Sequence, residues 1–318
     1  MKFSNMEKGN LTVLTEFILK GITDRPELQT PLFVLLLAIY LICAVGNLGI
    51  IILTKVDSRL QTPMYFFLRH LAVTDLGYST AVGPKMLVSF VSEHSSVSYY
   101  ICATQLACFL LFITCELFIL SAMSYDRYVA ICNPLLYMAI MSQTRCWILV
   151  AMPYLYSVFV SLLVTLRIFT LSFCSYNIIN HFFCDCIPLI SLLCSNTLEV
   201  ELIIRFFATF DLISSLLVVL VSYLFIFIAI LRMKSPEGRR KAFSTCGSHL
   251  TVVTVFYGTL IFMYVQPKSS QSFETDKVSS IFYTLVIPML NPLIYSLRNK
   301  DVKDAIGRTW KKIVNIFS

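Results

Sequence analysis

The stretch MSYDRYVAICNPLLY, residues 123–137, places an acid beside a base at the end of a long apolar run. The run begins near Ser98, and Glu116 is its one charged residue before Asp126 and Arg127. A helix needs about 20 mostly apolar residues to cross the hydrocarbon core of a bilayer. The run therefore predicts a membrane-spanning helix, with Asp126 and Arg127 at its polar boundary.

Working outward from this run, which covers about Ser98 to Ser124, the chain contains six further segments of the same kind. Hydrophobic residues make up 57% of the 318 residues and charged residues 14%, against about 25% charged in an ordinary soluble domain. The sequence therefore predicts an all-α membrane protein, a seven-transmembrane helix bundle in a single domain 1–318, with an arm 1–27, a bundle 28–297 and a tail 298–318. The six other segments are about Leu28 to Leu53, Met64 to Leu87, Arg145 to Leu166, Leu198 to Leu231, Ala242 to Val265 and Val278 to Leu297.

The distribution of lysine and arginine predicts the orientation of the chain. With the N-terminus outside, the inner segments hold 15 of these residues and the outer segments 7, as expected when basic residues gather on the cytoplasmic side. The net charge of +7 then reflects topology and does not indicate nucleic acid as a partner. Asn10-Leu11-Thr12 is a glycosylation sequon in the extracellular arm.

Five polar residues stand out inside the predicted membrane segments, where an ionisable group costs several kcal/mol. Each can be a packing contact that has found a partner, or part of a functional site. Asp75 and Glu116 are the hardest to explain by packing, because two carboxylates at similar depth repel unless they share a proton or a cation. A sodium ion between them is one hypothesis. The five residues are Asn47, Asp75, Glu116, Asp211 and Asn291.

Asp126 and Arg127 allow two interpretations. Arg127 can extend to the lipid headgroups while Asp126 pairs with it. Alternatively, the pair is a latch that opens when a cytoplasmic partner docks. The position of the pair in the third of seven helices favours the latch.

The seventh segment contains two prolines, Pro288 and Pro292, each of which removes a backbone donor and leaves a carbonyl in need of another partner. Asn291 is expected to supply one. Beyond Leu297, apolar residues recur at intervals of 3 to 4 among basic ones, which predicts a short amphipathic helix on the inner membrane surface. These residues are Val302, Ile306, Trp310 and Ile313.

Over essentially its whole length the chain resembles a vertebrate olfactory receptor of the tetrapod class II type, within the class A (rhodopsin-like) G-protein-coupled receptors. Ser124 departs from this pattern, where alanine is usual before Tyr125, and Gly247 is at a variable position. The resemblance is carried by Gly46-Asn47, PMYFFL at 63–68, Asp75, MSYDRYVAICNPLLY at 123–137, SY at 222–223, KAFSTCGSHL at 241–250 and PMLNPLIYSLRNKDV at 288–302.

The resemblance implies a receptor that holds a small volatile odorant in the outer half of the bundle. It also implies coupling to a heterotrimeric G protein of the stimulatory olfactory type, a rise in cyclic AMP, and location in the plasma membrane of olfactory sensory neuron cilia. Arg127 is similar to the family's ionic-lock arginine, with Asp126 as its partner. The positions implied in activation and coupling are Asp126, Arg127, Tyr128, Tyr223, Asn291, Pro292 and Tyr295.

Helical spacing outward from Asp126 suggests which side chains of the third segment face the ligand, and the fifth, sixth and seventh segments offer further candidates. The set is mostly apolar with a few hydrogen-bonding groups, which suits a small volatile molecule. The seventh segment has no lysine for a retinal Schiff base, and Phe109 stands where amine receptors keep an aspartate. The candidate ligand-binding residues are Phe109, Leu110, Ile113, Thr114, Phe207, Ala208, Asp211, Tyr257, Leu260, Tyr264 and Thr284.

The sequence HFFCDC, residues 181–186, could be a metal site, a redox site or a structural clamp by residue type alone. It lies in the long connection between the fourth and fifth segments, which the charge count places in the oxidising exterior. The resemblance implies disulfides Cys102–Cys184 and Cys174–Cys194. Cys184 would then be disulfide-bonded, and Cys186 would have no disulfide partner. A copper or zinc site from His181, Asp185 and Cys186 is the less favoured alternative, and no cofactor other than sodium is expected.

Two other function classes are less well supported by the sequence. An enzyme needs catalytic groups that converge at one depth, whereas the four histidines, His70, His94, His181 and His249, fall in different segments. A transporter or channel would also use polar residues at the midplane, but seven segments without a visible repeat do not favour it.

Overall fold

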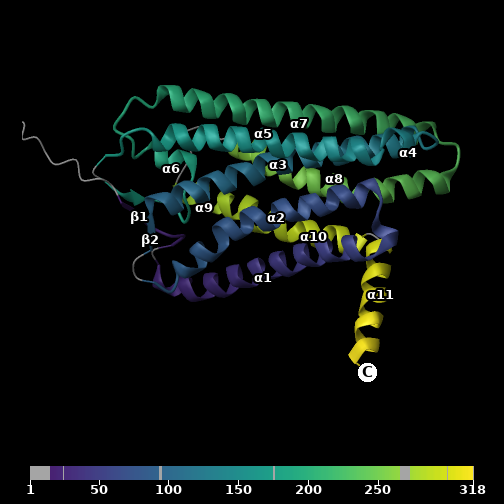
Figure 1. Cartoon of the computed structure of the whole chain (residues 1–318), viewed down its shortest axis with the longest axis horizontal. Coiled ribbons are helices and arrows are strands. Elements are labelled where there is room, and N and C mark those ends of the chain that lie inside the picture. The colour runs from purple at the N-terminus through teal and green to yellow at the C-terminus, as the bar shows by residue number, and fades with distance from the viewer. Residues whose placement is uncertain are drawn as a thin grey trace, which may run out of the picture.

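The computed structural model describes residues 15–23, 25–92, 95–174, 176–265, 273–298 and 300–317. Its long helices lie side by side as one elongated bundle (Figure 1). The long helices in chain order are α1 (Pro26–Val56), α2 (Pro63–Val88), α3 (Tyr99–Cys132), α5 (Gln143–Phe169), α7 (Leu198–Arg232) and α8 (Pro236–Val265). A seventh path combines α9 (Phe273–Ile281), the π-helical turn η2 (Phe282–Val286) and α10 (Ile287–Arg298).

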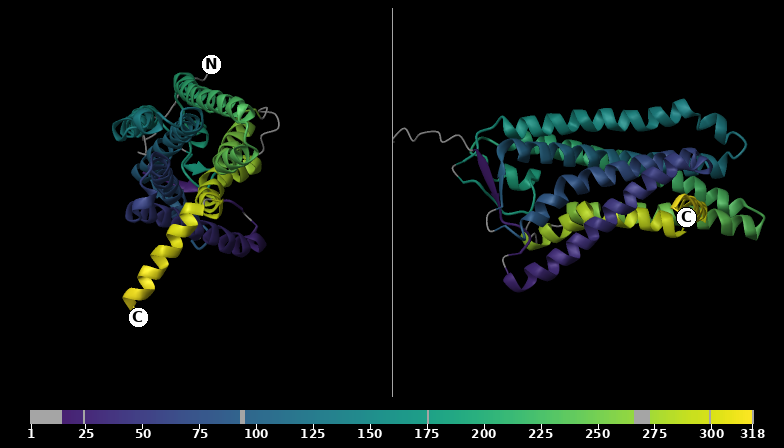
Figure 2. Two further views of the ribbon diagram at one scale, coloured as in Figure 1. Left: turned by 90° about the vertical axis from the view of Figure 1, so that its right-hand side faces the viewer. Right: turned by 60° about the horizontal axis from the view of Figure 1, so that its bottom comes forward.

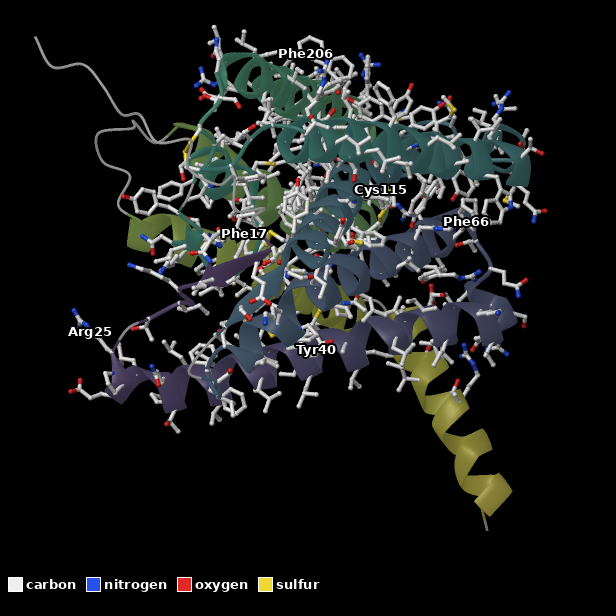
Figure 3. The ribbon with its side chains drawn as sticks, turned by 60° about the vertical axis from the view of Figure 1, so that its left-hand side comes forward. Phe17, Arg25, Tyr40, Phe66, Cys115 and Phe206 are labelled. Atoms are coloured by element: carbon white, nitrogen blue, oxygen red, sulfur yellow. A yellow bond between two sulfur atoms is a disulfide. The ribbon has the colours of Figure 1, made fainter. Side chains whose placement is uncertain are left out.

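Each predicted membrane segment falls in one of these seven paths. Five helical stretches are long and apolar enough to cross a membrane by length and composition: α1, α3, α5, α7 and Lys277–Tyr295. In α8 the apolar part is shorter, His249–Phe262, and α2 is interrupted by charged residues such as Arg69 and Asp75. Large apolar side chains such as Phe206, 62% exposed on α7, point away from the bundle, where lipid would surround them (Figure 3).

Proline and a polar cap begin several of these helices. Pro26 and Pro63 occupy first-turn positions of α1 and α2, where the missing backbone donor costs nothing. Ser98 caps α3 by accepting a hydrogen bond from the Ile101 backbone nitrogen. The boundaries of the predicted segments therefore shift outward by a few residues, because the helices continue through polar termini.

Pro292 leaves the carbonyl of Pro288 without its usual helical donor, and the structure corrects the expected partner. Asn47 Nδ2 on α1 donates to this carbonyl at 2.9 Å, whereas Asn291 turns toward Asp75. Gly46, one residue before Asn47, allows α1 to approach this kink, because a Cβ there would lie 2.9 Å from the Pro292 ring. The carbonyl that is freed at the kink therefore receives its hydrogen bond from a neighbouring helix.

A small sheet, which the sequence did not predict, closes the end of the bundle expected to be outside. Strand β1 (Glu16–Leu19) lies between β2 (Ser96–Ser98), with which it is antiparallel, and β3 (Ile178–Ile179), with which it is parallel. Phe17 on β1 is fully buried against Tyr99, Phe169 and Phe173 (Figure 3). We call this sheet, with the Phe17 contacts, the outer cap; the sequon at Asn10 lies outside the described residues.

At the opposite end, α11 (Lys300–Phe317) turns away from the bundle axis (Figures 1 and 2). Val302 is fully buried, and Ile306 is 48% exposed; the side chains of Trp310 and Ile313 are not among those described. Arg308 donates to the Asp57 carboxylate with both Nε and Nη2, at 3.0 and 2.7 Å. These hydrogen bonds hold the pKa of Asp57 below its ordinary value and pin α11 to the loop after α1.

Three short elements complete the connections. The turn η1 (Ser58–Leu60) follows α1, α4 (Tyr137–Ile140) lies between α3 and α5, and α6 (Cys186–Ile190) lies in the connection between α5 and α7. Both α4 and α11 are at the end opposite to the outer cap (Figure 1), which we call the inner end.

Candidate functional site

The outer half of α3 carries an aromatic cluster beneath the connection between α5 and α7. Phe109 is buried, and its ring centroid lies 5.3 Å from that of Phe183 in the connection and 5.8 Å from that of Tyr283 in η2. Three separate parts of the chain thus meet at one predicted ligand-binding residue. Neither Phe183 nor Tyr283 was predicted, because helical spacing along α3 carries no information about the loop above it.

The other predicted ligand-binding residues differ in how far their side chains are buried. Leu110, Ile113, Phe207, Ala208 and Leu260 are half-buried, and Thr114 is buried; the side chain of Tyr264 lies outside those described.

Two of the predicted polar positions already have protein partners. Tyr257 donates from its hydroxyl to the Leu117 carbonyl on α3 at 3.1 Å, and Thr284 donates to the Ser280 carbonyl of its own helical path at 2.7 Å.

Asp211 on α7, another predicted ligand-binding residue, also has a protein partner. Its carboxylate accepts a hydrogen bond from the Tyr156 hydroxyl on α5 at 2.5 Å, and only 3% of the residue is exposed. The Tyr156 ring in turn packs edge-on against Phe118 of α3. Asp211 thus joins α7 to α5, and its oxygen is already hydrogen-bonded.

Two disulfides hold the connection between α5 and α7 in place, and both pairings match those that the resemblance implies. Cys102 at the start of α3 is bonded to Cys184, and Cys174 to Cys194. A side-chain clamp adds to the first bridge, because Gln105 accepts from the Cys184 backbone nitrogen at 2.9 Å and donates to the Ala81 carbonyl on α2 at 2.8 Å. The connection is therefore fixed to both α2 and α3.

The remaining residues of HFFCDC do not come together around one point. Asp185 caps α6 by accepting from the Cys186 backbone nitrogen at 2.8 Å, and Cys186 is a buried free thiol whose pKa burial raises well above its ordinary value. A cysteine binds a metal as its thiolate, the form that this raised pKa disfavours. Within the part of the chain that the structure describes, no group of three metal-ligating side chains is found.

His181 is instead part of a hydrogen-bonded chain that the sequence did not reveal. Its Nε2 lies 3.2 Å from the Ser280 hydroxyl on α9, which also accepts from the Tyr283 hydroxyl at 2.9 Å. Its ring stacks on Phe182 and meets Phe183 edge-on. Burial, together with the positive charge of Lys277, lowers the pKa of His181 to about 3.

The lowered pKa of His181 predicts a loss of stability in acid. The unfolded chain binds this proton near pH 6.5 and the folded chain only near pH 3, so the contribution is complete above about pH 6.5 and declines as the pH falls toward 3. We expect the stability difference between the wild type and His181→Phe, which keeps the stacked ring, to shrink by up to about 1.4 kcal/mol per pH unit. Thermal unfolding of both proteins from about pH 7.5 to 5 measures it, and parallel curves would contradict it.

In the middle of the bundle, one amide bridges the two buried carboxylates. Asn291 Nδ2 on α10 donates to both oxygens of Asp75 at 3.1 and 3.0 Å, and lies 3.3 Å from Glu116 Oε1. Both carboxylates are fully buried, and Glu116 Oε2 has no hydrogen-bond partner among the described residues. The two acids on α2 and α3 are thus close together, as their similar depth predicted.

The inner end of α3 contains a closed ion pair. Arg127 Nη2 lies 2.8 Å from Asp126 Oδ2, and the other oxygen of Asp126 accepts from the Tyr137 hydroxyl of α4 at 2.8 Å. Burial and the Asp126 charge raise the pKa of Tyr137 above its ordinary value, which keeps the phenol protonated as a donor. Arg127 is thus paired with Asp126, and Asp126 is in turn hydrogen-bonded to Tyr137 in the connection after α3.

Three other residues implied in activation, Tyr128, Tyr223 and Tyr295, also lie at the inner end. Tyr223 on α7 shares a 2.6 Å hydrogen bond with His249 Nδ1 on α8, and Tyr128 packs on Phe225 of α7. Tyr295 is buried at the end of α10, where its hydroxyl has no partner among the described residues. These contacts join α3, α7 and α8 at the inner end.

Two apolar cavities lie away from the predicted ligand-binding residues. One, of about 350 Å³, is lined by α1, α10 and α11 near Gly46 and Pro292. The other, of about 370 Å³, is lined by α3, α5 and α7 near Tyr125 and Pro153.

Comparisons with known proteins agree with this geometry. A family model described as olfactory receptor matches residues 36–312. Olfactory receptor 8K3 of Homo sapiens is 73% identical over 312 residues, covering 98% of this chain and 100% of that protein. Olfactory receptor 8U3 of Mus musculus is 60% identical over 307 residues, covering 96% of each.

A crystal structure of squid rhodopsin has the same fold. It superposes with a TM-score of 0.69 at 17% identity, covering 91% of this chain and 87% of that chain. The seven predicted segments, the helix bundle and these relatives lead to one assignment: the chain belongs to the olfactory receptor family and folds as a multi-pass, rhodopsin-like G-protein-coupled receptor.

Proposed function

We propose that this receptor binds small volatile odorants in the outer half of its helix bundle. The observation that carries this proposal is the meeting of Phe109, Phe183 and Tyr283 from α3, the loop and η2. Aromatic and aliphatic walls with a few polar groups recognise small organic molecules. A ligand that contacts these three residues touches both η2 and the loop that is fixed to α3, and so can favour the conformation in which it makes the better contacts.

The signal would leave through the inner end. In the resting state Asp126 holds Arg127 at 2.8 Å, and docking of a G protein competes for that guanidinium. The docking surface includes Arg127, the loop after Cys132 and the residues from Lys234 to Ser248. The partner is a heterotrimeric G protein of the stimulatory olfactory type, acting at the plasma membrane of olfactory sensory neuron cilia and raising cyclic AMP.

Cyclic AMP measurements test this function directly. Cells that express the receptor with the olfactory-type stimulatory α subunit should respond to a panel of volatile compounds, and cells without that subunit should respond much less. A matched line without receptor controls for direct effects of the odorants. Odorant-driven ion flux that survives loss of the G protein would instead support a transporter or channel.

We also propose a sodium ion between Asp75 and Glu116. Glu116 Oε2, which has no hydrogen-bond partner among the described residues, could bind such an ion, because hard cations prefer carboxylate and carbonyl oxygens as ligands. Asp75 and Glu116 would hold the ion, and its charge would neutralise one of the two acids.

The sodium proposal predicts a cation-specific stabilisation. Raising sodium chloride from about 10 to 300 mM should raise the unfolding temperature of purified receptor by a few degrees, because a ligand that binds the folded state stabilises it. N-methylglucamine chloride at the same ionic strength should have a much smaller effect. Asp75→Asn should abolish the difference between the two salts, and a wild type that responds equally to both would rule out the ion.

A further inference from the structure

The hydrogen-bonded chain at His181 favours one of the two neutral forms of its ring. The Tyr283 hydroxyl donates to Ser280 Oγ at 2.9 Å, and Ser280 Oγ lies 3.2 Å from His181 Nε2. A hydroxyl that accepts from Tyr283 can donate its own proton to Nε2. A neutral imidazole with an acceptor at Nε2 carries its hydrogen on Nδ1, so the chain orients Nδ1–H as a donor.

That donor is buried without an acceptor. His181 is 4% exposed, and its Nδ1 has no hydrogen-bond partner among the described residues. Buried polar groups in folded proteins are nearly always paired, so an unpaired one calls for an explanation. A bound ligand with an acceptor atom would supply the missing partner.

The surroundings favour a neutral oxygen acceptor over a cation. Lys277 is one turn before Ser280 in α9 and is 8% exposed, and its charge together with burial keeps the pKa of His181 near 3. His181 is therefore a neutral donor at physiological pH, beside a positive charge that repels ammonium groups. Phe183 contacts both the His181 ring and Phe109, one of the predicted ligand-binding residues.

We propose that His181 Nδ1–H donates a hydrogen bond to the carbonyl oxygen of the odorant, so that this receptor selects aldehydes, ketones and esters. This inference rests on the odorant-binding function proposed above and names the chemical class it accepts. His181 becomes a specificity-determining residue, Ser280 and Tyr283 fix its tautomer, and Phe109 and Phe183 contact the hydrocarbon part of the ligand.

Three substitutions at His181 separate recognition from structural support. His181→Asn keeps an amide donor near the position of Nδ1, His181→Gln keeps a polar group near Nε2 and Ser280, and His181→Phe keeps only the aromatic contacts. The probes are octanal, 2-octanone and methyl heptanoate, with octane and 1-octene as matched compounds that lack the carbonyl. Full-length receptors are compared by ligand-induced thermal stabilisation after purification and by cyclic AMP in cells, normalised to surface expression.

The expected pattern is a preference for carbonyl probes in the wild type and in His181→Asn. His181→Phe and His181→Gln should lose about fivefold to tenfold of that preference, as for one hydrogen bond. Retention in His181→Gln with loss in His181→Asn would overturn the proposal and assign His181 to supporting α9. Equal stabilisation by carbonyl probes and hydrocarbons in the wild type would also overturn it.

The two readouts distinguish this inference from the proposed function. Carbonyl-selective thermal stabilisation without a cyclic AMP response would support His181 as the recognition residue and contradict coupling to the stimulatory G protein. If broad panels of volatile compounds neither stabilise nor activate the receptor, the odorant function itself fails, and the inference fails with it.

Discussion

Cys102→Ser is expected to remove most of the receptor from the cell surface. The bridge from Cys102 to Cys184 closes a loop of 82 residues, and loss of a native disulfide typically costs about 2–5 kcal/mol. That is a large share of the net stability of a folded protein. The clamp through Gln105 would be the main remaining tie between this part of the loop and α3. Surface labelling of epitope-tagged receptor, divided by total expression, measures the effect.

Two controls isolate the effect of the bridge. Cys108→Ser changes a free cysteine two turns further along α3 and should leave the surface fraction close to wild type. The double variant Cys102→Ser with Cys184→Ser prevents Cys184 from pairing wrongly with nearby Cys186 and should match the single variant. A Cys102→Ser receptor that reaches the surface as well as Cys108→Ser would contradict the structural role of this disulfide.

Arg127→Ala should abolish the cyclic AMP response to any activating odorant, at equal surface expression. The substitution removes the guanidinium proposed to engage the G protein, and it leaves Asp126 buried with the Tyr137 hydroxyl as its hydrogen-bond partner among the described residues. Breaking a buried pair in this way costs about 3–5 kcal/mol, so expression must be measured in parallel. Arg145→Ala, an exposed arginine at the inner end, is the matched control and should keep the response.

The opposite effect is expected when the holding partner changes. Asp126→Asn removes the charge that retains Arg127, and a loss of about 1.4 kcal/mol from the resting state shifts the balance of two states about tenfold. Basal cyclic AMP should therefore rise without odorant. Tyr137→Phe removes only the supporting 2.8 Å hydrogen bond to Asp126 and should raise basal cyclic AMP less. Basal activity unchanged in Asp126→Asn would exclude the latch.

Hydropathy predicts the helices well because the bilayer imposes a length and a composition on each of them. Leu198 to Leu231 was predicted, and α7 is Leu198–Arg232. The same reasoning brought Asp75 and Glu116 to similar depth, where Asn291 bridges them. Membrane burial makes these residues conspicuous, since polar groups are expensive there.

The parts that could not be predicted depend on contacts between distant segments. Asn47 donates the hydrogen bond to the Pro288 carbonyl that was expected from Asn291, because Gly46 lets α1 approach the kink. The hydrogen bond from Tyr156 of α5 to the Asp211 carboxylate could not be read from the sequence of either helix. His181 was weighed as a metal ligand, whereas its partner, Ser280, is 99 residues away in sequence. Residue types indicate what a side chain can bind, but only the fold determines which partner lies beside it.

The outer cap has a consequence for the order in which the chain assembles. Strand β1 is synthesised first, but Asn177, which donates to its Glu16 carbonyl, follows 161 residues later, and β3 is its parallel neighbour. Contacts between such distant residues form slowly, because the entropy of closing the loop must be overcome before they stabilise anything. Until four long helices are inserted, the edge of β1 that later pairs with β3 is exposed and can pair with other chains. Substitutions in β1 would therefore act during biogenesis, changing how many receptors mature rather than what each mature receptor detects.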